Sequence, residues 1–392
     1  MMIVCVTGGD PTKVGLLKEL PNADSKLKLL EADVYKPDGF ALAIQKKKKK
    51  RRKKKKMMIV CVTGGAGYLA SFLIRSLLHR GYTVHATLRN LGDPTKVGLL
   101  KELPNADSKL KLFEADVYKP DEFAPAIHGC HVVIHMATPL QHTPQTSQYK
   151  NTGEAAVAGV RSIAEACIRA GTVKKLIYTA SVVAASPLMD NATGFKDSFD
   201  ETCWTPFDFP TPYHSDFFME YTRSKTLAEK EVLSYNGKGI QVVSLALGVV
   251  GGRETLQSWM PESLGLMVSQ ATNDKNRYQG LRFMEELLGK VPIVHVEDVT
   301  AAHIFCLEHQ HINGRFLCAS SYLKSVEIAS YYQLHFPLIK IPQEFIEDTK
   351  RDTKWGSRKL EEAGFEWKYD YNMILSDSLE CAKRFCNLHI IS

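Results

Sequence analysis

The chain has 392 residues, of which 44% are hydrophobic, and a formal net charge of +7 at pH 7. Residues 1–56 hold 16 Lys or Arg and 6 Asp or Glu, a net +10, so residues 57–392 carry +7 minus +10, or −3. This mildly acidic body excludes nucleic-acid binding by general electrostatics, and no apolar run is long enough for a membrane-spanning helix. The nine cysteines show no paired spacing and there is no signal peptide, so we expect reduced thiols and a cytoplasmic location.

The chain begins with an incomplete copy of a later segment. Its first nine residues recur at 57–65, and residues 10–44 match 93–127 at all but three positions. The first copy has no counterpart of residues 66–92, so it lacks the helix and second strand of a βαβ unit. We therefore interpret residues 1–56 as a partial duplicate followed by a linker, either disordered or produced by an error in the gene model.

Eleven consecutive basic residues, Lys46 to Lys56, join the two copies. Such a run is either a nuclear-import or polyanion-binding segment, or a solvated, self-repelling linker or translation artefact. A nucleic-acid-associated protein driven by this run would show a salt-sensitive affinity that disappears without residues 1–56. We expect the linker, and no nucleic-acid partner for the body of the chain.

Apolar runs and helical patterns alternate from residue 57 onward. The predicted strands are 58–63, 82–88, 109–114, 131–135, 173–179, 240–247 and 291–295. The predicted helices are near 68–80, 150–171, 217–235, 298–309 and 372–386. This order predicts an α/β fold with a doubly wound parallel sheet of the Rossmann type. We expect a dinucleotide-binding domain at 57–247 and a smaller substrate-binding lobe at 248–392, part of which returns to the first domain.

A glycine-bearing turn follows the first strand of the body. Gly64, Gly67 and Ala70 have G-x-x-G-x-x-A spacing, directly after a strand and at the opening of a helix. Glycine permits the tight turn and lets backbone N–H groups approach a pyrophosphate at the helix N-terminus. Ala70 need only allow close packing of helix and strand. The context therefore predicts a dinucleotide site.

The end of the second strand indicates which dinucleotide binds. An acidic residue there would hold a ribose 2′-hydroxyl, but the segment reads TLRN and places Arg89 at that point. A guanidinium fits a 2′-phosphate, so the sequence favours NADP(H). Lys96 is either a second cation for this phosphate or an ordinary exposed lysine.

Two further segments follow strands that lead to the same sheet edge. Asp116, at the end of the third predicted strand, could accept a hydrogen bond from the adenine amino group. Met136, Ala137 and Thr138 follow the next strand, where small residues would let the cofactor cross the sheet edge. His135 itself is expected to be a packed strand residue.

A second constellation predicts acid–base chemistry. Tyr221 and Lys225 are four residues apart on a predicted helix, so they lie on one face. A neighbouring ammonium stabilises the phenolate and should bring the tyrosine pKa toward neutral pH. Ser181 ends a predicted strand at the sheet edge where such folds place their sites, and its hydroxyl can hold a substrate oxygen.

These segments carry a family resemblance. TGGAGYLAS, the strand-ending TAS, YTRSKTLAE and PIVHVEDV resemble the extended short-chain dehydrogenases/reductases. More narrowly, GYTVHATLRN, TASVVAASPL, DETCWTP and GRFLCA resemble the plant dihydroflavonol 4-reductase group, and within it HC-toxin reductase and anthocyanidin-reductase-like members. The resemblance covers residues 57 to about 388.

The resemblance implies a catalytic triad of Ser181, Tyr221 and Lys225. The cofactor contacts that it and the turn imply are Gly64, Gly67, Tyr68, Leu69, Ala70, Arg89, Lys96, Asp116, Val117, Met136, Ala137, Thr138, Tyr221, Lys225, Ala246, Leu247, Gly248, Val249 and Ser263. No metal is implied.

The implied function is an NADPH-dependent carbonyl reductase acting on a plant phenolic or flavonoid-type ketone. Alternatives are a detoxifying reductase of a xenobiotic or toxin carbonyl and, in another class, a non-catalytic NADP-binding redox sensor, which would need a broken triad.

Ser186 stands where dihydroflavonol reductases often place an Asn or Asp that contacts the substrate, so the identity of the small-molecule substrate stays open. Ala156 or Ala158 stands near the position of a helix asparagine used elsewhere in the superfamily. Either a monomer or a homodimer is expected.

Overall fold

The computed structural model describes residues 58–139, 148–189, 194–348 and 353–386. The partial duplicate and the basic run lie outside these residues, so the expectations about residues 1–56 stay predictions. Residues Ile59–Ser392 form one compact unit.

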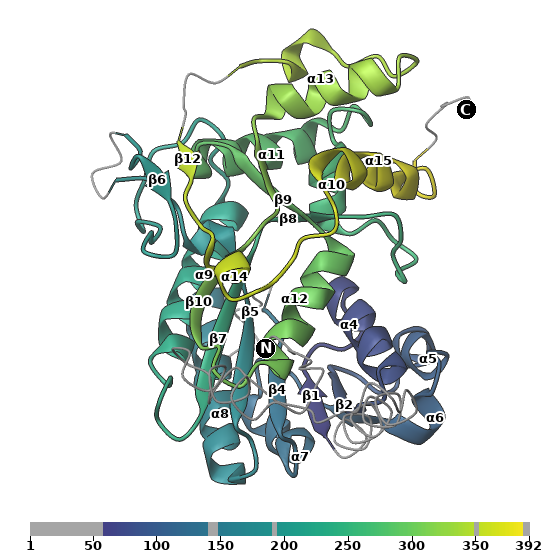
Figure 1. Cartoon of the computed structure of the whole chain (residues 1–392), viewed down its shortest axis with the longest axis vertical. Helices are drawn as coiled ribbons and strands as arrows, with labels where there is room; N and C mark the ends of the chain where they lie inside the picture. The colour runs from purple at the N-terminus through teal and green to yellow at the C-terminus, as the bar shows by residue number, and fades with distance from the viewer. Residues whose placement is uncertain (1–57, 140–147, 190–193, 349–352, 387–392) are drawn as a thin grey trace, which may run out of the picture. The chain divides into compact units, whose positions relative to one another are not determined.

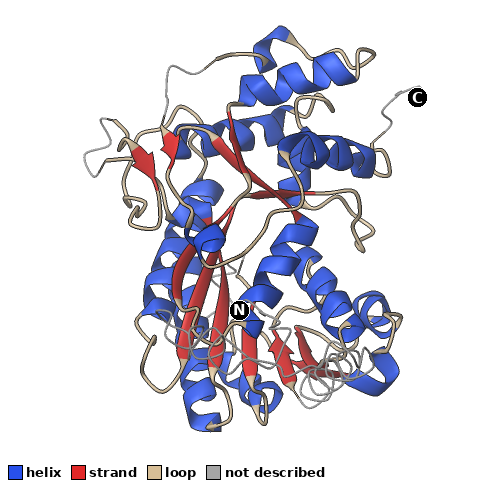
Figure 2. Ribbon diagram, in the orientation of Figure 1, coloured by secondary structure: helices blue, strands red, loops and turns tan. Residues whose placement is uncertain are grey.

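The main sheet of the described chain has seven parallel strands in the order β10-β7-β5-β4-β1-β2-β3 (Figures 1 and 2). In that order, the strands are Gly314–Cys318, Gln241–Leu247, Lys175–Ser181, Val132–His135, Ile59–Val62, Thr83–Leu88 and Leu110–Glu114. The chain leaves β1 toward β2 and later returns to β4 on the other side of β1. The strand order therefore reverses between β1 and β4, where sheets of this type bind ligands at the carboxyl ends of their strands.

Helices cover the sheet on both faces. Helices α4 and α12 pack against each other on one face, and α8 and α9 pack against each other on the other (Figure 1). The helices are α4 Tyr68–His79, α5 Pro94–Lys101, α6 Ala106–Lys109, α7 Ala124–Ile127, α8 Thr152–Ala170, α9 Asp216–Leu233, α10 Glu262–Val268, α11 Lys275–Leu288, α12 Val296–Glu308, α13 Ser325–His335, α14 Lys359–Glu362 and α15 Tyr371–Ala382. The predicted doubly wound parallel sheet is confirmed.

Local sequence explains where the long helices begin and end. The side chain of Asn151 accepts a hydrogen bond from the Glu154 amide and caps the start of α8. Gly171 ends that helix in the left-handed region with φ 66°, which glycine adopts at little cost. The helix predicted near 150–171 is confirmed as Thr152–Ala170.

A second layer follows β7. Its three-stranded sheet has the order β11-β9-β8, formed by Ser321–Leu323, Val291–His295 and Val249–Gly251. The predicted strand at 291–295 is present but belongs to this sheet. The seventh place in the main sheet is taken by β10, which was not predicted because Arg315 interrupts its short apolar run. A two-stranded pair, β6 Ser198–Phe199 with β12 Lys354–Trp355, completes the strands of the described residues.

The two layers share one core and meet at Gly248. Buried apolar side chains of both layers form a single cluster, for example Leu176 and Val242 of the main sheet with Ile293 and Leu375 of the second layer. A Cβ at Gly248 would lie 2.6 Å from the Pro292 carbonyl oxygen, so only glycine fits between β7 and β8. The division into 57–247 and 248–392 stays a proposal.

Candidate active site

The glycine turn after β1 is tightly packed against the end of β4. Gly64 has φ +67°, and a Cβ there would lie 3.1 Å from the Ala137 Cα. The Gly67 amide donates to the Gly64 carbonyl at 2.9 Å, and α4 begins at the next residue. A side chain at Gly64 would therefore be both strained and crowded, and its absence leaves room for a ligand to approach the backbone.

The first residues of helix α4 add free backbone N–H donors beside the glycine turn. An α-helix leaves the N–H groups of its first residues without intrahelical acceptors, and its dipole favours an anion there. In α4 these amides belong to Tyr68, Leu69 and Ala70. The Tyr68 side chain is buried, so its contribution to this site is through its backbone. The turn and helix fit the pyrophosphate of a dinucleotide.

Thr63, at the end of β1, fixes the backbone that follows β4. Its hydroxyl oxygen accepts hydrogen bonds from the amides of Met136 and Ala137, both at 3.0 Å. Because both acceptor positions are used, its own proton goes to His135 Nδ1 at 2.8 Å. Burial lowers the pKa of His135 to about 3, so this ring is neutral. His135 is a packed strand residue, as expected.

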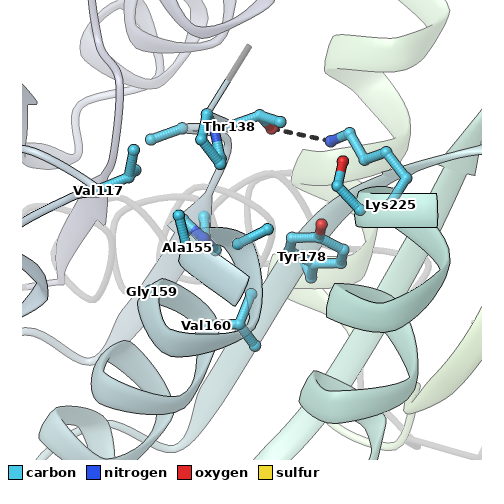
Figure 3. Close-up of a pocket in the computed structure, with 12 residues that line it drawn as sticks. Val117, Thr138, Ala155, Gly159, Val160, Tyr178 and Lys225 are labelled. Atoms are coloured by element: carbon cyan, nitrogen blue, oxygen red, sulfur yellow. Dashed lines mark hydrogen bonds between the residues drawn. The ribbon is translucent and has the colours of Figure 1, made fainter. Parts of the chain in front are cut away.

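Helix α9 and strand β5 bring the predicted triad together. Ser181 is the last residue of β5, and Tyr221 and Lys225 lie one turn apart on α9. The Ser181 side chain lies near enough to Tyr221 to lower the pKa of its phenol. The Lys225 ammonium donates to Thr138 Oγ1 at 2.9 Å (Figure 3). It also donates to the Thr179 carbonyl at 3.2 Å.

The two ionisable members of this group have shifted pKa values. Burial raises the pKa of Tyr221, and the nearby Ser181 side chain acts against this rise. Burial lowers the pKa of Lys225 to about 8, and the negative charge of Glu229 opposes this shift. The expectation that the Tyr221 pKa falls toward neutral pH is not met, because burial is the largest influence on it. The Lys225 ammonium is bonded to Thr138 and lies 6.0 Å from the centre of the Tyr221 ring. Tyr221 therefore holds its proton at neutral pH.

A cavity of about 10 Å³, room for one water molecule, lies beside Lys225. Figure 3 shows its walls, which come from Val117, Thr138, Tyr178 and the α8 residues Ala155, Gly159 and Val160. Of the two alanines near the position of the absent asparagine, Ala156 lines this cavity, whereas Ala158 lines a separate groove between α8 and α9. The small α8 side chains leave this space open.

Comparison with known proteins identifies the family. The model of the NAD dependent epimerase/dehydratase family matches residues 60–319, more than half of the chain. The chain belongs to this family. It is 34% identical over 325 residues to an anthocyanidin reductase ((2S)-flavan-3-ol-forming) of Vitis vinifera, which covers 82% of this chain and 94% of that protein. It is 33% identical to a dihydroflavonol 4-reductase of Gerbera hybrida, with 82% and 85% covered.

Solved structures share the fold of this chain. Vestitone reductase from alfalfa has 32% identity and a TM-score of 0.67, with 83% of this chain and 98% of that chain covered. Yeast methylglyoxal/isovaleraldehyde reductase Gre2, complexed with NADPH, shares the fold at 20% identity and a TM-score of 0.64. The comparisons confirm the predicted family, and the reductase names agree with the predicted NADP(H)-dependent oxidoreductase class.

In this epimerase/dehydratase-family chain the two predicted cations differ in environment. Arg89 is exposed directly after β2, and no ion pair to its guanidinium is found among the described residues. The Lys96 ammonium lies 3.2 Å from the Asp93 carboxylate, which also caps α5 through the amides of Thr95 and Lys96. Arg89 is therefore the cation better placed to meet a 2′-phosphate, and Lys96 is partly neutralised.

The remaining predicted contacts vary in their proximity to the triad. Residues 246–249 lie beside it, since Leu247 is paired with Ser181 and Ala246 with Ala180. Val117 lines the cavity beside Lys225, whereas one Asp116 carboxylate oxygen accepts from the Tyr118 amide. Ser263 is half-buried in the first turn of α10, and no hydrogen bond among the described residues ties it to the triad.

The sequence did not predict several residues that hold the candidate site in place. The Gly64 amide donates to Thr87 Oγ1 at 3.2 Å, so Thr87 positions the glycine turn. Thr179 bonds the buried His303 ring at 2.9 Å, and Gln257 donates to the Ala66 carbonyl at 3.0 Å. Thr63 stands directly before the two glycines, so its role at the turn could have been predicted from its position. The other contacts join segments far apart in sequence and could not be predicted from local pattern.

The described residues lack two structural features. Within them, no helix combines the length and the apolar character needed to cross a bilayer. The same residues contain no group of three or more His, Cys, Asp or Glu arranged to hold a metal ion.

Proposed function

We propose that this protein is an NADPH-dependent carbonyl reductase of a phenolic, flavonoid-type or related small-molecule ketone. The observation that carries the proposal is the meeting of Ser181, Tyr221 and Lys225 at the carboxyl edge of the sheet, beside the backbone of residues 246–249. A non-catalytic sensor would not need an intact acid, its neighbouring serine and a buried ammonium in one place.

When bound, the dinucleotide supplies the hydride. The chain supplies the rest of the chemistry. The hydroxyls of Ser181 and Tyr221 hold the substrate oxygen, and Tyr221 gives its proton to that oxygen as negative charge develops there. One hydride to carbon and one proton to oxygen convert the carbonyl to an alcohol. The nearby Lys225 ammonium stabilises the phenolate that Tyr221 becomes.

Arg89 supports NADPH over NADH as the partner. Its guanidinium is exposed at the end of β2, where the family's fold brings the adenosine ribose. A planar guanidinium binds a phosphate through two parallel hydrogen bonds. Asp93, the nearby carboxylate, already bonds Lys96 and the start of α5, so it is not free to hold a ribose diol.

An aromatic surface beside Tyr221 supports a substrate with a ring. Phe217 lies one turn before Tyr221 on α9, with the two rings nearly parallel at 8° and their centres 6.3 Å apart. Phe217 is 49% exposed, which is unusual for a large apolar side chain next to a catalytic group. The names of the relatives, anthocyanidin reductase and dihydroflavonol 4-reductase, agree with an aromatic substrate.

We also propose the cytoplasm as its compartment. All eight cysteines in the described part of the chain are free, and seven of them are buried. A reducing compartment keeps such thiols unpaired.

A substrate panel tests the function. Purified protein is mixed with NADPH and with aromatic ketones, flavonoid-type carbonyls, toxin-like carbonyls and aliphatic ketones, and both NADPH oxidation and the alcohol product are measured. We expect turnover with an aromatic carbonyl. Turnover confined to toxin-like carbonyls would favour the detoxifying alternative, and NADPH binding without any product would favour the sensor.

A further inference from the structure

The segment that follows β8 connects the second layer to the glycine turn. Residues 252–258, here called the strap, are held at one end by the C-terminal part of the chain. The Gly252 amide donates to Ser378 Oγ on α15 at 3.0 Å, and the Arg384 guanidinium donates to the Thr255 carbonyl at 3.0 Å. The strap therefore leaves the second layer from a fixed point.

The other end of the strap carries Gln257, whose side chain reaches the cofactor turn. Gln257 is only 6% exposed. Its amide nitrogen donates to the Ala66 carbonyl at 3.0 Å and lies 3.5 Å from Ser71 Oγ. Ala66 is inside the glycine turn and Ser71 is in the first turn of α4, 191 and 186 residues away in sequence.

The chemistry of these contacts is specific for an amide donor. Both groups that face the Gln257 nitrogen are oxygens, one of them a backbone carbonyl that can only accept. The Ser71 hydroxyl already donates its proton to the Tyr68 carbonyl at 2.9 Å, so its oxygen is left to accept. A carboxylate at position 257 would place negative charge against the carbonyl oxygen, whereas an apolar side chain would leave it unpaired.

The bonded carbonyl belongs to the peptide that enters the dinucleotide site. Fixing the Ala66 carbonyl fixes the peptide plane between Ala66 and Gly67, because a peptide is planar. The amides of the α4 first turn follow immediately. An anion site made of backbone N–H groups binds well only if those groups are already oriented before the ligand arrives.

We propose that Gln257 is a positioning residue for the dinucleotide: it holds the glycine turn in its binding conformation from the strap. This inference rests on the proposed function only through the dinucleotide, and it is independent of which carbonyl is reduced. It also gives the strap a role, because Gln257 then links the second layer to the cofactor end of the main sheet.

The test is a cofactor titration without substrate, on full-length protein. NADPH binding is measured by fluorescence. We expect Gln257→Leu and Gln257→Glu to weaken it by about three- to ten-fold, the effect of one hydrogen bond. Gln257→Glu should be the weaker binder of the two. Hydrogen exchange of the peptide covering residues 64–71 should become faster in both cofactor-free variants. The KM for the carbonyl substrate should change little.

Gln270→Leu is the matched control. Gln270 is also a buried glutamine, and its side chain donates to the carbonyls of Ser325 and Phe345 in the second layer, at 3.0 and 2.7 Å. Its loss should lower the melting temperature without changing NADPH affinity. Parent-like NADPH affinity in both Gln257 variants would overturn the inference, as would equal weakening by Gln270→Leu. If the parent protein binds NADPH but reduces no carbonyl, that result would count against the proposed function. The comparison of NADPH affinity between the parent and the Gln257 variants would still hold.

Discussion

The ammonium of Lys225 donates to the hydroxyl of Thr138, 2.9 Å away, and so joins helix α9 to the backbone that follows β4. Lys225 is only 5% exposed. A charge held in this place is costly, which is why burial lowers the pKa of Lys225 to about 8. The lysine therefore titrates close to the working pH.

The pH dependence of turnover should show the titration of Lys225. The protonated form stabilises the phenolate, so kcat should fall as pH rises through about 8. The rate is measured from pH 6 to 10 with both substrates saturating, and Lys225→Met should be nearly inactive at every pH. A parent rate that is constant from pH 7 to 10 would show that the ammonium is not needed.

Tyr221→Phe should remove the proton donor and keep the ring. We expect kcat to fall by about two orders of magnitude or more, the usual scale of a general acid, with NADPH affinity retained. Tyr235→Phe is the matched control, because its hydroxyl bonds Glu165 at 3.4 Å away from the triad. Near-parent turnover by Tyr221→Phe would place the acid elsewhere.

Arg89→Asp should abolish the preference for NADPH over NADH. One charge-assisted contact to a 2′-phosphate is worth about 1.5–3 kcal/mol, or about ten- to a hundred-fold in the ratio of kcat/KM for NADPH and NADH. Arg80→Asp makes the same charge change at the exposed C-terminal end of α4 and should leave the ratio unchanged. Equal efficiency of the parent with both dinucleotides would contradict the assignment.

A buried ion pair anchors the catalytic helix. Glu229, one turn after Lys225 on α9, receives two hydrogen bonds from the Arg315 guanidinium of β10, at 3.0 and 2.9 Å. Arg315→Met should destabilise the protein by about 3–5 kcal/mol, because it leaves a buried carboxylate without its cation. The measurement is denaturant unfolding.

The double variant Glu229→Met/Arg315→Met should lose less stability than the sum of the two single variants, since neither charge is then left alone. Removing the exposed pair of Arg169 and Glu165 should cost less than about 1 kcal/mol and provides the control. Additive losses at the buried pair would show that the two charges do not stabilise each other.

Truncation tests the interpretation of the duplicate. We expect residues 57–392 to fold and turn over without residues 1–56, because the first copy lacks the glycine turn, the helix and the Arg89 strand. Both proteins are compared in melting temperature, NADPH affinity, activity and polyanion binding. An insoluble or inactive truncated protein beside an active full chain would make the duplicate part of the fold.

The alternation of strands and helices was predictable from the sequence because it depends on local periodicity. Apolar runs such as residues 131–135 and helical patterns such as 150–171 are encoded by neighbours within two turns or one strand. β10 escaped prediction because Arg315, a buried charge, is tolerated there only by the carboxylate of Glu229 on another element. The strand at 291–295 was predicted correctly, but which sheet it joins depends on long-range pairing.

The parts of the candidate site could be predicted from local sequence: the glycine turn, Arg89 at a strand end, and Tyr221 with Lys225 on one helical face. These follow from turn chemistry and from the helical repeat, which act over a few residues. Three features became visible only in the folded chain: the bond from Lys225 to Thr138, the raised pKa of Tyr221, and the bond from Gln257 to Ala66. Desolvation and side-chain contacts depend on which distant elements pack together, and no local pattern in the sequence carries that information.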